Sequence, residues 1–184
     1  MKKALIILAN GFEDIEAVTP IDILRRGGIT VIVAGLGGTE IKGSRGTVIK
    51  AEIALEDYNG VPDALILPGG NTGAENLALS PRVKELILSV SSKGKIVAAI
   101  CAAPALVLAP TGILDGKKAT CYPGMEENFS PKVKASGDDV VQDGNIITSR
   151  GPATAFPFAL KILENLAGKN VAETIAEGTL YSRS

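Results

Sequence analysis

The 184-residue chain contains no histidine and only two cysteines. Without histidine, a Ser-His-Asp or Cys-His mechanism cannot be assembled within this chain, so any general base must be a carboxylate, lysine, tyrosine or cysteine. Two thiols do not make a disulfide framework, and a zinc site would have only these thiols and carboxylates to draw on. We therefore expect neither a structural disulfide nor a metal site.

Long apolar runs and an excess of charge are also absent. No stretch approaches the ~20 apolar residues of a membrane span. The 19 basic and 20 acidic residues leave a net charge of −1, which gives no electrostatic case for binding nucleic acid or a membrane surface. The N-terminal apolar run covers only residues 4–9 and is followed by acids, which favours a first strand over a signal peptide. We expect a cytoplasmic protein.

Short apolar runs alternate with helical patterns along the whole chain. This alternation predicts one domain over residues 1–184, an α/β sandwich with a mostly parallel central sheet. We expect hairpins within residues 36–50 and between residues 133–135 and 140–142, and helix N-caps at Asp14 and Asn170. The expected strands are 4–9, 29–34, 64–67, 96–100 and 145–149, and the expected helices are 15–26, 81–92, 102–109, 153–166 and 171–177.

Cys101 lies at the junction between an apolar strand and the following helical pattern. The small residues Ala99, Ala102 and Ala103 surround it, so the backbone can turn sharply there, as at a nucleophile elbow. A thiol at a helix N-terminus meets unpaired N–H groups that favour the thiolate. The alternative is a buried cysteine that acts as a small hydrophobic residue.

Three segments that follow predicted strands share one crevice at the carboxyl ends of those strands. Glycines at 69 and 70 allow close approach of the backbone, so the N–H groups of Gly70 and Ala102 can form an oxyanion hole; the alternative is an ordinary turn. Glu16 is the acid of its helix start with the most apolar neighbours. Beside a thiolate its carboxyl would be protonated and donate a hydrogen bond; the alternative is a solvated carboxylate.

Six blocks of sequence occur in order along the chain: GFEDIEAVTPIDILRRGGI, VAGL, GSRGTVI, LPGGNTGAENL, IVAAICAAPALVLA and TSRGPATAFPFALKILENLAGK. Together they resemble the ThiJ/PfpI superfamily, on the branch of the Parkinsonism-associated deglycase. The resemblance implies a flavodoxin-like α/β/α fold, a homodimer, Cys101 as the reactive cysteine and Glu16 as its carboxyl partner. It also implies Arg45 near both the dimer interface and the pocket, with Arg150 and Pro152 lining that edge. Gly69 is expected to line the pocket as well.

The chain departs from that superfamily at two places. Ala102 stands where the intracellular-protease branch has histidine after its nucleophile, which disfavours peptidase activity. Tyr122 stands where the deglycase branch commonly has a histidine at the pocket, and a phenol is a poor base near neutral pH. A kinase is disfavoured because the chain has no G-x-x-x-x-G-K-[ST] loop.

The resemblance favours a cofactor-independent glyoxalase or deglycase that acts on small aldehydes or dicarbonyls through Cys101. The alternative is a non-catalytic redox sensor or chaperone, in which Cys101 is oxidised to a sulfinate that Glu16 and the backbone N–H groups stabilise.

Overall fold

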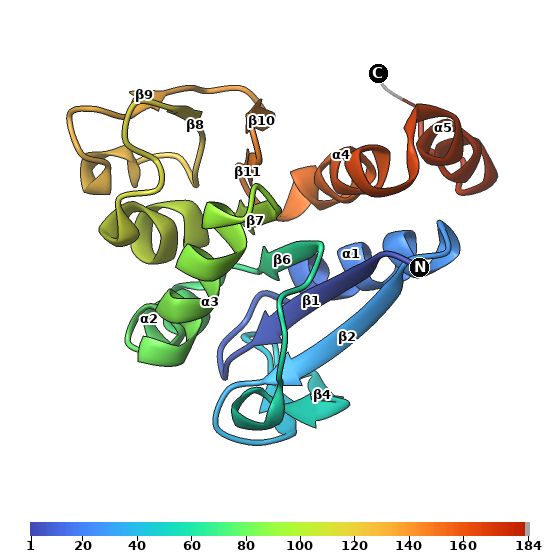
Figure 1. Cartoon of the computed structure of the whole chain (residues 1–184), viewed down its shortest axis with the longest axis horizontal. Helices are drawn as coiled ribbons and strands as arrows, with labels where there is room; N and C mark the ends of the chain where they lie inside the picture. The colour runs from blue at the N-terminus through green and yellow to red at the C-terminus, as the bar shows by residue number, and fades with distance from the viewer. Residues whose placement is uncertain (183–184) are drawn as a thin grey trace.

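A seven-stranded sheet forms the centre of the computed structural model, which describes residues 1–182 (Figure 1). The strand order is β10-β11-β7-β6-β1-β2-β5, and every neighbouring pair is parallel except β10 with β11. This confirms the predicted mostly parallel sheet. The strands of this sheet are β1 (Lys3–Leu8), β2 (Thr30–Gly35), β5 (Ile53–Ala54), β6 (Ala64–Leu67), β7 (Ile96–Ile100), β10 (Val140–Asp143) and β11 (Ile146–Ser149).

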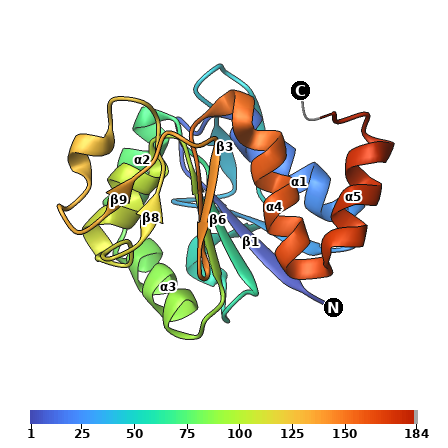
Figure 2. The same ribbon diagram turned by 90° about the horizontal axis from the view of Figure 1, so that it is seen from above.

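Helices cover both faces of the sheet, which explains why the central strands β6 and β7 consist entirely of buried apolar residues. Figure 2 shows α1, α4 and α5 on one side and α2 and α3 on the other. No helix among residues 1–182 is long and apolar enough to cross a membrane. The helices are α1 (Asp14–Arg26), α2 (Asn71–Ala78), α3 (Pro81–Ser92), α4 (Ala155–Ala167) and α5 (Lys169–Gly178).

Two small sheets lie outside the central one. The hairpin predicted within residues 36–50 is confirmed as β3 (Glu40–Lys42) paired antiparallel with β4 (Val48–Lys50). The hairpin predicted between residues 133–135 and 140–142 is wrong. Instead, β9 (Lys134–Ala135) pairs in parallel with β8 (Lys118–Ala119), while β10 pairs with β11 through a turn in which Gly144 adopts φ 61°.

Both predicted helix caps are also wrong. Glu13 and Gly168 occupy the N-cap positions of α1 and α5, and neither makes a side-chain capping bond. The carboxylate of Asp14 is instead used in a tertiary contact, where it accepts the backbone N–H of Arg45 at 3.2 Å. The sequence reasoning also missed α2, because its turn-forming residues obscure a helix whose Gly73 lies directly against the backbone of Phe12.

The segment after Cys101 is helical but not a regular α-helix. Residues 104–108 form a π-helical turn and residues 109–111 a 3₁₀ turn, in place of the predicted helix over 102–109. Pro104 is in the first turn, where a missing N–H is tolerated, whereas Pro110 lacks the N–H that would continue a regular helix. The wider turn is a common local adjustment near functional residues.

Helix α1 buries only part of its apolar stripe. Ile23 and Leu24 lie in the core, whereas Ile15 and Val18 are 54% and 48% exposed. Exposed apolar side chains on a helix that starts at the crevice fit the symmetric dimer implied by the sequence. We therefore expect sedimentation to give twice the mass of one chain at micromolar concentration, and Val18→Glu to give a monomer.

The control for that experiment is Leu79→Glu, because Leu79 is 81% exposed at the end of α2 on the other side of the sheet. It adds the same charge and is expected to leave the dimer intact. A wild-type protein that sediments as a monomer would overturn the prediction.

Candidate active site

Cys101 forms the sharp turn that the sequence predicts. Its φ is 64°, in the left-handed region that non-glycine residues seldom occupy. Its N–H donates to the carbonyl of Ser149 at 2.9 Å, and its carbonyl accepts the N–H of Tyr122 at 2.8 Å. Neighbouring segments on both sides therefore hold the strained backbone in place.

Glu16 is fully buried beside the Cys101 thiol, which confirms that it is the least solvated acid of its segment. Its Oε2 accepts the N–H of Gly69 at 2.8 Å. The other oxygen, Oε1, has no geometrically aligned hydrogen-bond partner among residues 1–182. The carboxyl is thus held at one oxygen and faces the thiol.

Gly69 and Gly70 bring the backbone between these two side chains. A Cβ on Gly69 would lie 2.6 Å from Cys101 Cβ and 2.7 Å from Glu16 Oε2. Gly70 has φ 84°, and a Cβ there would lie 2.3 Å from the carbonyl oxygen of Gly11. No larger residue fits at either position, so the glycines are required for the approach.

The thiol and carboxyl strongly affect each other. Burial raises the pKa of Glu16 to about 7, and the neighbouring Glu13 charge contributes in the same direction. Burial, then the Glu16 charge, raises the pKa of the Cys101 thiol to about 12, while hydrogen bonds from the Gly70 and Ala102 N–H groups lower it. The thiolate expected from a helix N-terminus is therefore opposed by burial.

Burial raises the pKa of Cys101 in either state of the pair, but the size of the shift depends on whether Glu16 carries a negative charge. When Glu16 is protonated, its penalty on the thiolate disappears, and the sulfur faces two N–H groups whereas the carboxylate accepts one. The pair can thus pass a single proton between sulfur and oxygen.

The other predicted pocket residues form two groups beside this centre. Tyr122, Arg150 and Pro152 line one cavity of about 280 Å³, and Tyr122 is linked to the elbow through its backbone. Arg45 lies in the loop between β3 and β4, with its Nε 4.0 Å from Glu13 Oε2 at the start of α1 and its side chain largely exposed. Neither arginine acts on the Cys101 thiol directly in this structure.

The sequence reasoning missed the part played by Ser149. Its carbonyl holds the elbow, and its hydroxyl lies 2.6 Å from Thr154 Oγ1 and donates to the carbonyl of Asp139 at 2.8 Å. One feature of the sequence could have indicated this part: Thr148 and Ser149 are a polar pair at the end of an otherwise apolar buried strand.

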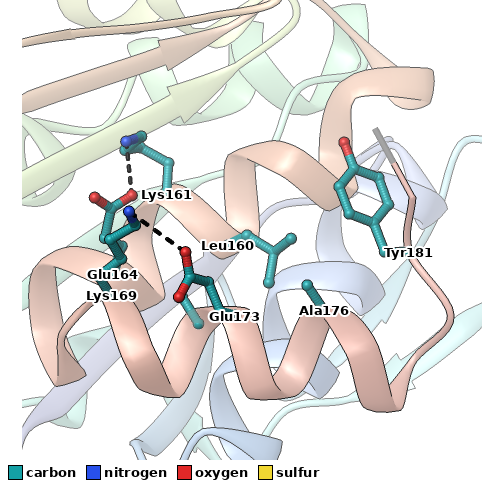
Figure 3. A pocket seen from close by; sticks show the side chains of 8 residues that line it. Leu160, Lys161, Glu164, Lys169, Glu173, Ala176 and Tyr181 are labelled. Atoms are coloured by element: carbon teal, nitrogen blue, oxygen red, sulfur yellow. Dashed lines mark hydrogen bonds and ion pairs between the residues drawn. The ribbon is translucent and has the colours of Figure 1, made fainter. Parts of the chain in front are cut away.

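A separate cavity of about 360 Å³ lies between α4 and α5, away from the elbow (Figure 3). Its lysines and glutamates are already paired, Lys161 with Glu164 at 2.7 Å and Lys169 with Glu173 at 3.5 Å. The described residues 1–182 contain no cluster of three metal-ligating side chains.

The fold and the crevice together define a class: α/β proteins with an elbow cysteine facing a buried carboxyl. Within that class the chain belongs to the DJ-1/PfpI family, whose sequence profile matches residues 2–165. It is 45% identical to Parkinson disease protein 7 homolog of Danio rerio over 179 residues, 95% of this chain and 94% of that protein. It is 39% identical to the glutathione-independent glyoxalase DJR-1.2 of Caenorhabditis elegans over 170 residues, 91% and 90% of the two chains.

Solved structures confirm the flavodoxin-like fold. Oxidised Toxoplasma gondii DJ-1 superposes with a TM-score of 0.96 at 37% identity, covering 100% of both chains. Drosophila melanogaster DJ-1beta gives a TM-score of 0.92 at 44% identity over 99% of both chains. The predicted family and fold are therefore both confirmed.

The raised pKa of Glu16 makes a prediction about stability. An unfolded chain releases this proton near the ordinary value of 4.5, but the folded protein holds it to about pH 7. The resulting stabilisation is complete below pH 4.5 and lost as pH rises through 7, by up to about 3 kcal/mol. Glu16→Gln, which stays neutral, is therefore expected to be more stable than wild type at pH 8.5 in urea unfolding, with the gap closing at pH 5.

The matched control is Glu127→Gln, which removes an exposed carboxylate. It is expected to change the free energy of unfolding equally at both pH values. A Glu16→Gln variant that showed the same pH dependence of unfolding as wild type would contradict the raised pKa.

Proposed function

We propose that this protein acts on reactive dicarbonyls or their adducts as a cofactor-independent glyoxalase or deglycase, with Cys101 as nucleophile. The observation that carries the proposal is the contact of a strained elbow thiol with a buried carboxyl of pKa about 7, next to two backbone donors. The relative named glutathione-independent glyoxalase, similar over 91% of this chain, supports the same chemistry.

The first step is addition of Cys101 to an aldehyde. The sulfur bonds to the aldehyde carbon of a methylglyoxal-like substrate, and the carbonyl π electrons move to oxygen. The N–H groups of Gly70 and Ala102 face the sulfur and stabilise the oxyanion as it forms. The proton that the thiol loses passes through Glu16 to this oxygen, which gives a hemithioacetal and leaves Glu16 as a carboxylate.

The second step is a proton transfer between neighbouring carbons, for which the chain offers Glu16. Its carboxylate takes the proton from the former aldehyde carbon and returns it to the adjacent carbon. The hydroxyl proton on the first carbon passes to the neighbouring carbonyl oxygen, which gives a thioester of lactate. Water then hydrolyses the thioester and restores the thiol. A base with a pKa near 7 is well matched to this task at neutral pH.

The order of three variants tests this mechanism. Cys101→Ser is expected to abolish conversion of methylglyoxal to lactate, because the nucleophile is lost. Glu16→Gln is expected to lower kcat by about 10²-fold or more. Tyr122→Phe should cost roughly tenfold or less, because the phenol only orients the carbonyl.

Lactate formation is measured over many turnovers. Equal losses in Tyr122→Phe and Glu16→Gln would mean that the phenol transfers the proton. Wild-type turnover in Cys101→Ser would remove the elbow from the mechanism.

A redox sensor is the second candidate function, and the same N–H groups favour it. Peroxide can oxidise Cys101 to a sulfenate and then to a sulfinate, releasing one water at each step, and the sulfinate oxygens would take the place of an oxyanion. The related Toxoplasma gondii structure is of an oxidised protein. In this function the protein consumes oxidant once per site and forms no lactate.

The sensor hypothesis predicts a difference between two Glu16 variants. Glu16→Gln keeps an N–H donor toward the sulfur, whereas Glu16→Ala removes the partner, so mass spectrometry after peroxide should find more surviving sulfinate in Glu16→Gln. Equal sulfinate in both variants would exclude Glu16 as its partner.

A further inference from the structure

Glu13 connects the catalytic pair with the β3–β4 hairpin. Its N–H donates to the carbonyl of Gly69 at 3.0 Å, while the N–H of the same glycine donates to Glu16. The start of α1 therefore binds both the N–H and the carbonyl group of Gly69. A Cβ on Gly70 would lie only 2.8 Å from the nitrogen of Glu13, so the two segments are in direct contact.

The side chain of Glu13 is nearly buried and is held by the hairpin loop. It is 12% exposed, and its Oε2 accepts the hydroxyl of Ser44 at 3.0 Å. The Nε of Arg45 lies 4.0 Å from the same oxygen. The loop is fixed in turn to the helix start, because the N–H of Ser44 donates to the carbonyl of Phe12 at 2.8 Å.

The carboxylates of Glu13, at the N-cap of α1, and Glu16, in its first turn, repel each other, and the burial of both side chains limits screening by solvent. A negative charge on Glu13 makes ionisation of Glu16 harder. Arg45 attracts the Glu13 carboxylate toward the hairpin loop and so weakens its effect on Glu16. The exposed Arg45 side chain and the 4.0 Å separation make this attraction small.

We propose that Glu13 is a positioning residue that sets the proton affinity of the Glu16–Cys101 pair, and that Arg45 on the β3–β4 hairpin acts on the pair through Glu13. The hairpin thereby tunes the crevice without touching the substrate. This inference concerns the site of the proposed function but does not depend on turnover.

Besides Glu13, two groups in contact with Glu16 affect its pKa. From the elbow it meets the Cys101 thiol, and from the loop after β6 it meets the Gly69 N–H. Asp14 lies between Glu13 and Glu16 in sequence, but its carboxylate is directed to the backbone of the hairpin, where its Oδ2 accepts the Arg45 N–H. Glu13 is thus the charged neighbour of Glu16 outside the pair.

The test is an NMR titration of the Glu16 side-chain carboxyl carbon, assigned by its loss in Glu16→Gln. Glu13→Gln is expected to lower the apparent pKa of Glu16 by about 0.5–1 unit, because it removes the repulsion and keeps the shape. Arg45→Ala should raise it by roughly 0.2–0.3 unit at low salt and leave it unchanged in 1 M NaCl. The double variant should titrate like Glu13→Gln alone, because Arg45 acts through Glu13.

Glu40→Gln is the matched control, since it removes an exposed carboxylate from the same hairpin and is expected to leave the titration of Glu16 unchanged. An unshifted titration in Glu13→Gln overturns the role of Glu13. A double variant that differs from Glu13→Gln alone overturns the path from Arg45.

The outcome is separable from that of the proposed function. A shifted titration in a protein that converts no methylglyoxal supports this inference and overturns the glyoxalase proposal. An unshifted titration in a protein with full turnover overturns this inference and supports the glyoxalase proposal.

Discussion

The contact between the Cys101 thiol and the Glu16 carboxyl is the constraint on which the rest of this crevice depends. Burial opposes ionisation of both acidic groups, and a charge on Glu16 further opposes ionisation of Cys101. The surrounding backbone supplies what solvent cannot: an N–H for the carboxyl from Gly69, and two for the sulfur from Gly70 and Ala102. The N–H groups of Gly69 and Gly70 reach the pair only because these two residues have no side chain. The glycines, the strained elbow and the buried acid therefore form one unit.

Much of this unit could be predicted from the sequence, because its parts follow strands. Apolar runs with sharp boundaries identify β6 and β7, and the crevice rule then brings Gly69, Gly70 and Cys101 together. The small residues around Cys101 correctly predicted its turn. Glu16 was identified by its apolar neighbours, a local signal that survives folding. Each of these features depends on residues that are close to it in the sequence.

The features that could not be predicted depend on distant segments. The capping role expected of Asp14 is lost to a contact with Arg45, 31 residues away. The strand β10 pairs with β11 rather than with the preceding segment, and local turn residues do not distinguish the two partners. Burial by several elements raises the pKa of the Cys101 thiol, whereas the sequence indicates only the helix N-terminus, which favours the thiolate. Long-range packing decided each of these outcomes.

Both hydrogen-bonding groups of the Cys101 main chain are already occupied, one by Ser149 and the other by Tyr122. The Cys101 thiol is therefore held in one direction by its backbone, and the elbow is a fixed part of the scaffold. Under the proposed function, a change in substrate range then comes from side chains of the neighbouring cavity, such as Tyr122 and Arg150. Reactivity and selectivity are in that case carried by separate sets of residues, so that mutation changes the substrate while the reacting atoms stay in place.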